Sequence, residues 1–306
     1  MKNRILRYIG LGDHSGKILI TGATGHVGSK VFNILEVENV DVRGAVRNFE
    51  KAEDLKLNRD DLVYFDYTKP ETFEEAFEDI EKVLFIAPPL DPKAFELLKP
   101  AIDYVIEKKV KHIVVLSAYG VEQSDEIPLR KIELHVKNSG ILYTIVRPNF
   151  FMENFTTGFL SEPIKNDREI VIPAGDGKTS FIDTRDIAAV IAEILINKIY
   201  INQVYILTGP EALNHYEIAS ILSEIWEKEI TYKPISEEDM RDTLKSKGIS
   251  EENINMTLGL YYPVRKGFNA KITDDVGKVL GRDPVTFKKF LIECTSKPVE
   301  TTAIAC

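Results

Sequence analysis

The sequence predicts an α/β protein with a doubly wound parallel sheet and a smaller mixed C-terminal part. Three observations lead to this prediction. A mostly aliphatic run at 17–21 turns through closely spaced glycines into a helix-like pattern at 26–36. Strand-like and helix-like runs then alternate as far as Pro148, which is typical of parallel strands joined by right-handed crossover helices. After Pro148 the alternation stops, so a second structural part begins there.

The elements before Pro148 are predicted from their apolar patterns, in chain order. Strands are expected in the short runs rich in aliphatic residues, at 17–21, 40–46, 62–66, 82–87, 112–117 and 141–147. Between the strands, apolar residues recur at helical spacing, as Val27, Val31 and Ile34 show in the first case. Helices are therefore expected near 26–36, 71–79, 93–109 and 128–138. Ligands of such sheets bind at the carboxyl ends of the strands.

The chain after Pro148 is predicted to alternate less regularly. Residues 149–180 carry scattered glycines and prolines and are expected to be irregular. A helix at 184–197 and a strand at 204–208 follow. From residue 210 onward helices are expected, because polar residues suited to N-caps precede apolar runs at Asn214, Ser236 and Ser250.

Gly22, Gly25 and Gly28 form the most informative motif of the chain. A strand that turns tightly into a helix presents unpaired N–H groups and the positive end of the helix dipole, and a pyrophosphate fits there. Glycine is needed because a Cβ would block the turn, the phosphates or the packing of helix on strand. The motif predicts a Rossmann-like nucleotide site, and the alternative is a glycine-rich turn without a ligand.

The motif and the break at Pro148 divide the chain into two interleaved parts without a flexible linker. Residues 1–148 plus 182–209 are expected to form an NAD(P)-binding Rossmann domain. Residues 149–181 plus 210–295 are expected to form the substrate-binding part, and 296–306 a disordered tail.

Composition excludes several other classes of protein. The chain has 306 residues, 44% of them hydrophobic, and a net charge of −9, which argues against a partner such as nucleic acid or an anionic membrane. No apolar run approaches the roughly 20 residues of a spanning helix, and 1–16 lacks the apolar core of a signal peptide. We therefore expect a cytoplasmic protein. Cys294, Cys306 and the scattered histidines show no metal-ligand spacing, so no metal is expected, and Cys306 is either a reactive thiol or incidental.

Segments 21–28, 45–48 and 139–154 resemble the NmrA-like group of atypical short-chain dehydrogenases, and the similarity runs from about 16 to 291. That group includes NAD(P)H:quinone and azo reductases, together with redox-sensing regulators that bind the cofactor without turnover. The resemblance therefore implies a nicotinamide cofactor and a small-molecule acceptor, and it is compatible with a homodimer.

The end of the second strand decides which dinucleotide is expected. An acid there would bind the ribose hydroxyl of NAD and repel a 2′-phosphate. This chain instead has Arg47, 19 positions after Gly28, with Lys51 close behind it, while Asp41 opens the strand and should point away. A guanidinium can grip a phosphate with two hydrogen bonds, so NADP is preferred over NAD. The alternative is that both cations are ordinary solvated charges.

Other contacts to the cofactor are predicted at the strand ends. The resemblance implies that Asp66 accepts a hydrogen bond from the adenine amino group, although a simple strand-end cap is the alternative. Small or proline residues after the fourth strand let the backbone pass close to the cofactor. The resemblance places the end of the sixth strand against the nicotinamide. The cofactor-binding residues are thus expected to be Gly22, Thr24, Gly25, His26, Val27, Gly28, Arg47, Lys51, Asp66, Ala87, Pro88, Pro89, Pro148 and Phe151.

The catalytic Tyr-x-x-x-Lys pair of ordinary short-chain dehydrogenases is not found where the resemblance places it. Tyr104 with Lys108 comes one element too early, and Tyr262 with Lys266 lies in the C-terminal part. At the expected positions, alignment finds Asp125 for tyrosine and Leu129 for lysine. Reduction of a ketone needs a matched proton donor, whereas electron-poor acceptors need one much less. The sequence therefore favours acceptors of the quinone, azo or iminium type.

The remaining site residues follow the fifth and sixth strands. Ser117 and Tyr119 are the catalytic candidates, because the superfamily carries its catalytic serine there; capping of the loop is the alternative for Tyr119. Glu133 is expected to anchor its helix rather than react. The aromatic residues predicted to contact substrate, or else to form plain core, are Phe150, Phe155 and Phe181.

Two functions from different classes are consistent with these residues. The first is an NAD(P)H-dependent oxidoreductase in which the protein orients cofactor and acceptor and excludes water. The second is an NmrA-type redox sensor that binds the dinucleotide and acts through a protein partner. The complete C-terminal part, with 279–284 and the helix at 287–291, favours the enzyme because the resemblance implies that these residues close the pocket.

Overall fold

The computed structural model describes residues 16–295, so the predicted tail at 296–306, with Cys306, lies outside the described residues. Within them, seven parallel strands form one sheet in the order β3-β2-β1-β4-β5-β6-β8. The strands are β1 (Lys17–Thr21), β2 (Val42–Val46), β3 (Leu62–Tyr64), β4 (Ile80–Ile86), β5 (His112–Leu116), β6 (Leu142–Pro148) and β8 (Gln203–Leu207). The order reverses between β1 and β4, which confirms the predicted doubly wound fold; ligands of such folds bind at the carboxyl ends of the strands on either side of the reversal.

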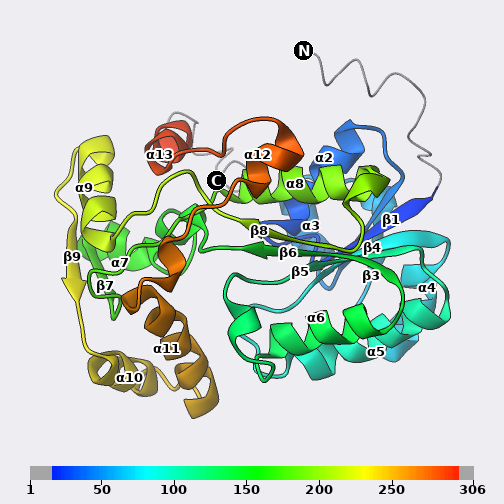
Figure 1. Cartoon of the computed structure of the whole chain (residues 1–306), viewed down its shortest axis with the longest axis horizontal. Helices are drawn as coiled ribbons and strands as arrows, with labels where there is room; N and C mark the ends of the chain where they lie inside the picture. Colours follow the sequence, from blue (N-terminus) through cyan, green and yellow to red (C-terminus); the bar gives the residue numbers. More distant parts are fainter. Residues whose placement is uncertain (1–15, 296–306) are drawn as a thin grey trace.

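Helices cover both faces of the sheet (Figure 1). One face carries α2 (Gly28–Val37), α3 (Phe49–Asp54) and α8 (Thr184–Ile196); the other carries α4 (Phe73–Phe77), α5 (Ala94–Glu107) and α6 (Pro128–Asn138). Successive side chains of a strand point to opposite faces of the sheet, so each strand contributes to two separate hydrophobic cores. Ile18 and Ile20 of β1 pack with α2 and α8, whereas Leu19 packs with α5 and α6.

The second part lies beyond the carboxyl ends of β6 and β8, on the left of Figure 1. A two-stranded parallel sheet forms its spine, made of β7 (Glu169–Ile172) and β9 (Thr231–Pro234). Its helices are α7 (Ser161–Asp167), α9 (His215–Trp226), α10 (Glu237–Ser246), α11 (Glu251–Arg265) and α13 (Phe287–Thr295), whereas α12 (Asp275–Leu280) lies beside α8. The expected N-caps are confirmed, since Asn214, Ser236 and Ser250 each accept a hydrogen bond from the first turn of their helix.

The prediction that 149–180 is irregular is wrong, because α7 and β7 lie within it. Both elements are short, and β7 is completed by pairing with β9, about sixty residues later in the chain (Glu169 opposite Thr231). The pattern of a four-residue strand is too brief to stand out among glycines and prolines.

A separate hydrophobic core holds the second part together. Its buried members include Phe155 and Ile164, Ile218 and Leu222 of α9, and Phe287 of α13. One element departs from the predicted division: α12 falls within 210–295, yet its Val276 and Val279 pack in the core that α8 shares with β8. Among residues 16–295, no helix is long and apolar enough to cross a membrane.

Candidate cofactor and acceptor site

The glycine turn closes tightly between β1 and α2. Gly22 has φ +62°, a left-handed conformation that favours glycine. A Cβ on Gly28 would lie 2.2 Å from the carbonyl oxygen of Gly22, so only glycine lets the helix approach the strand end this closely. The first and third glycines therefore have the geometric roles expected of them.

Amide groups at this turn are available to a ligand. Gly22, Gly25 and His26 are exposed, and Gly25 donates its N–H to the Gly22 carbonyl at 2.9 Å. Within residues 16–295, the N–H groups of Thr24 and Val27, like that of His26, make no hydrogen bond to another backbone group. Thr24, His26 and the buried Val27 thus have amides without a backbone partner among the described residues, at the start of a ten-residue helix whose dipole suits the phosphates of a dinucleotide.

Two exposed cations follow β2, the strand next to β1. Lys51 lies in the first turn of α3, where its N–H is capped by Asn48 at 3.0 Å. Partial burial, and then the charges of Lys30 and Lys51, lower the pKa of His26, so Lys51 lies near the glycine turn although α3 belongs to the next βα unit. Arg47 follows β2 directly and is exposed.

Asp66 lies at the carboxyl end of β3, within the field of Arg47. Its Oδ1 accepts hydrogen bonds from the N–H (2.9 Å) and the hydroxyl (2.7 Å) of Thr68. Burial raises the pKa of Asp66, but the Thr68 hydrogen bonds and the Arg47 charge outweigh it, so the net shift is downward. Asp66 therefore caps its own turn, and its role toward adenine stays a prediction.

The other side of the candidate site follows β4. Ala87 and Pro88 are half-buried and Pro89 is exposed. A Cβ on Gly22 would lie 3.4 Å from the Cβ of Ile86, so this segment faces the glycine turn across the boundary between β1 and β4. The structure thus brings the predicted phosphate and ribose contacts to one place.

Ser117 belongs to a buried charged network behind the end of β5. Its hydroxyl donates to Oε1 of Glu133 at 2.7 Å. Arg147 donates to both carboxylate oxygens of Glu133, at 2.7 and 2.5 Å, and Arg130 donates to Oε2 at 3.0 Å. Burial raises the pKa of Glu133, but the hydrogen bonds from Arg147 and Ser117 and the Arg147 charge lower it further than burial raises it. Glu133 is therefore a charged carboxylate that anchors its helix to the sheet, and it accepts the hydrogen bond that the Ser117 hydroxyl donates.

Tyr119 connects the sheet to the second part. Its N–H donates to the Pro148 carbonyl at 2.9 Å, and its hydroxyl donates to the Phe268 carbonyl at 3.0 Å. Burial and then the Glu122 charge raise the pKa of the phenol. Tyr119 is thus half-buried and lies where β5 and β6 end. Its hydroxyl is hydrogen-bonded to the backbone of the segment that follows α11.

The Tyr-x-x-x-Lys matches lie elsewhere. The Tyr104 ring packs against Phe73 and Phe77 on the α4 side of the sheet. Tyr262 is 54% exposed on α11.

At the positions that alignment gives to the pair, Asp125 accepts a hydrogen bond from Arg130 at 3.0 Å. Leu129 packs against the core that contains α5 and α6.

The two adjacent phenylalanines after β6 point into different cores. Phe151 forms a bridge with Ile182 and packs with the helices on the sheet. Phe150 instead packs with the second part, its ring 6.4 Å from that of Phe181, which lies 5.2 Å from Phe155. The three predicted substrate residues are therefore gathered in one place, and Phe151 is separated from them.

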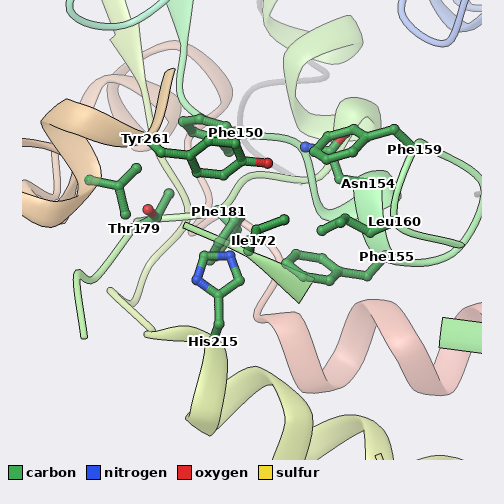
Figure 2. A pocket seen from close by; sticks show the side chains of 11 residues that line it. Phe150, Asn154, Phe155, Phe159, Leu160, Ile172, Thr179, Phe181, His215 and Tyr261 are labelled. Atoms are coloured by element: carbon green, nitrogen blue, oxygen red, sulfur yellow. The ribbon is translucent and has the colours of Figure 1, made fainter. Parts of the chain in front are cut away.

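Phe150, Phe155 and Phe181 line a cavity of about 10 Å³ (Figure 2). Three further lining residues were not expected from the sequence: Thr179, His215 and Tyr261. The only signal for them was indirect, since His215 follows a predicted N-cap and Tyr261 precedes the tyrosine of a Tyr-x-x-x-Lys match. Neither feature indicates that the side chains meet.

Comparison with known proteins places the chain among reductases. The model of the NmrA-like family matches residues 14–272. The chain is 33% identical over 293 residues to prestalk A differentiation protein A of Dictyostelium discoideum, covering 92% of this chain and 96% of that protein. It is 31% identical over 277 residues to the NAD(P)H azoreductase of Xenophilus azovorans, covering 89% and 96%.

A solved structure of an NADPH-dependent quinone oxidoreductase from Escherichia coli, in complex with NADPH, has the same fold. It matches with a TM-score of 0.77 and 26% identity, covering 90% of this chain and 98% of that one.

Proposed function

The chain belongs to the NmrA-like family, and we propose that it passes a hydride from NADPH to an electron-poor small molecule of the quinone, azo or iminium type. The matches confirm the predicted class of NAD(P)H-dependent oxidoreductase. The observation that carries the proposal is the set of amides of Thr24, His26 and Val27 at the start of α2, which bond to no backbone group among residues 16–295 and suit a dinucleotide diphosphate.

The preference for NADP is supported by charge. Arg47 and Lys51 are both exposed, and Lys51 acts electrostatically on the glycine turn. A phosphate on the adenosine ribose would meet these cations, whereas one carboxylate oxygen of Asp66 already accepts two hydrogen bonds from Thr68. When bound, the cofactor supplies the hydride, and the residues of the chain hold and orient it.

The choice of acceptor is supported by the scarcity of proton donors. The Ser117 hydroxyl donates to Glu133, and the Tyr119 phenol, with its raised pKa, donates to a backbone carbonyl. An acceptor whose reduced form is a stabilised anion or a neutral amine can take its proton from water afterwards. The aromatic side chains of Phe150, Phe155 and Phe181 suit a flat acceptor.

Oxidation of NADPH in the presence of menadione or an azo dye tests this function. We expect turnover with NADPH, and we expect Arg47→Ala to raise the KM for NADPH about tenfold while leaving the KM for NADH unchanged, because a charged hydrogen bond is lost. Lys165→Ala, an exposed position of α7 away from the strand ends, is the matched control. Tight NADPH binding without oxidation of any acceptor would contradict the enzyme and favour the redox sensor.

A further inference from the structure

The aromatic cavity contains three polar side chains that are almost completely buried. Thr179, His215 and Tyr261 are 1%, 4% and 2% exposed. Among residues 16–295, the Thr179 hydroxyl, Nδ1 of His215 and the Tyr261 hydroxyl have no hydrogen-bond partner. All three side chains line the same cavity. In Figure 2 the Tyr261 hydroxyl points toward the side where Asn154 and Phe159 lie, with the imidazole of His215 below it.

Buried polar atoms without partners destabilise a folded protein, so a cluster of them calls for an occupant. In folded proteins nearly all such atoms are paired, either with protein groups or with ordered water. A cavity of about 10 Å³ is near the smallest that holds one water molecule, and such a water is held by two to four polar partners. The three groups here meet that requirement in number and in size of the space.

The chemistry of the cluster selects a neutral polar group. Burial lowers the pKa of His215 to about 4, so the imidazole is uncharged at neutral pH and offers one donor and one acceptor. The two hydroxyls can each donate and accept. Apart from the half-buried amide of Asn154, the rest of the lining is apolar and largely aromatic, as Phe150, Phe155 and Phe181 show. A carbonyl or phenol oxygen on an aromatic ring matches both features, whereas a cation or a carboxylate would be left without a counter-charge.

We propose that this cavity is the inner end of the acceptor site, where Thr179, His215 and Tyr261 bind the neutral oxygen substituent of an aromatic acceptor in place of water. The inference rests on the proposed function, since Phe150 joins the cavity to the carboxyl end of β6. Within the classes named above, it selects a quinone-type acceptor over a cationic iminium.

An aromatic ring needs more room than the cavity now has, and Phe159 is the side chain that can provide it. Phe159 lines the cavity but is 56% exposed. Moving this side chain therefore loses less buried contact area than moving any other aromatic side chain of the lining. It lies between η4 (Met152–Phe155) and α7. The remaining aromatic lining residues belong to the buried core and stay in place.

Calorimetric titration of 2-naphthol and of naphthalene, into protein saturated with NADP⁺, tests the inference by binding alone. The two ligands share a ring system and differ by one hydroxyl. We expect the wild type to bind 2-naphthol about tenfold more tightly, and Tyr261→Phe to reduce this preference to below threefold without weakening naphthalene. Tyr262→Phe, the exposed neighbour on α11, is the matched control and should retain the preference.

Thr179→Val, which keeps the shape of the side chain, provides a second test that does not depend on α11. It should also reduce the preference for 2-naphthol. The inference is overturned if the wild type binds neither ligand, binds both equally, or keeps its preference in both variants. Failure of the proposed function looks different: NADPH then does not bind, or is not oxidised with menadione, whatever the naphthol titration gives.

Discussion

Two buried polar clusters of this molecule differ in whether their hydrogen bonds are complete. Around Glu133, between α6 and the sheet, both carboxylate oxygens are bonded to Arg147, with Ser117 and Arg130 completing the set. In the aromatic cavity of the second part, Thr179, His215 and Tyr261 have polar atoms without a partner among the described residues.

The difference separates polar groups that stabilise the fold from polar groups that can bind a ligand. A network in which each group satisfies the next fixes one arrangement of helix on sheet and leaves nothing for a ligand. A cluster of buried donors and acceptors without partners gains hydrogen bonds when a ligand or water binds there. It is therefore the better candidate for a binding site. By this reasoning Ser117, although it follows β5 where the superfamily places its catalytic serine, acts chiefly through Glu133.

The largest effect is expected when the complete network is broken. Glu133→Gln removes the fully buried one of the two carboxylates that pair with Arg147 and leaves only the partly exposed Glu122, so we expect a loss of about 3 kcal/mol in the free energy of unfolding. Urea denaturation measures it. Glu126→Gln, whose carboxylate is exposed beside Lys131, should change stability by less than about 0.5 kcal/mol. Equal effects of the two variants would contradict a structural role for Glu133.

A second buried carboxylate lacks such arginine partners, and its titration sharpens the comparison. Glu153 accepts hydrogen bonds from the backbone and hydroxyl of Thr184; burial, and then the charge of Asp183, raise its pKa to about 7 from 4.5. Because the folded state holds this proton more tightly than the unfolded state, the stabilisation is present below pH 4.5. It is lost as the pH rises through 7, by about 3 kcal/mol.

Urea denaturation between pH 5 and 8, on the order of one pH unit per step, should show the wild type losing stability relative to Glu153→Gln as the pH rises. The comparison is made between variants because the lowered pKa of His215 changes the stability of both proteins in the opposite direction below about pH 6.5. Glu162→Gln, exposed on α7, should follow the wild type. A difference between wild type and Glu153→Gln that does not change with pH would assign the titration to another group.

The smallest effects come from a matched pair of tyrosines. The Tyr67 hydroxyl donates to Oγ1 of Thr21 at 2.9 Å and to the Ile86 carbonyl at 3.1 Å, so Tyr67→Phe should cost about 1 kcal/mol. Tyr261→Phe removes an unpaired hydroxyl and should be neutral or slightly stabilising. Thermal unfolding of both variants, without added ligand, compares them. If Tyr261→Phe costs more than Tyr67→Phe, the contrast between the two clusters is wrong.

Local patterns in the sequence predicted the strands of the nucleotide-binding half and most of its helices, although the short helix α3 (Phe49–Asp54) was not predicted. Gly22 and Gly28 mark the turn because backbone conformation and close approach exclude a Cβ there. The alternation of strands and helices implies the parallel sheet, and Asn214 and Ser236 mark helix starts because a cap bonds to residues two or three positions away. Each of these inferences depends on residues close together in the chain.

What the sequence did not reveal depends on contacts between distant residues. β7 exists because β9 pairs with it, and α12 packs on α8 rather than with its neighbours in the chain. Thr179, His215 and Tyr261 come from a loop and two helices, and each is unremarkable in its own segment.

The sequence by itself therefore determined the fold class, the glycine turn and the family, because backbone constraints and hydrophobic periodicity are local properties. Only the tertiary structure decided which polar groups line the aromatic cavity and which are already hydrogen-bonded, because packing sets hydrogen-bond partners across distant parts of the chain.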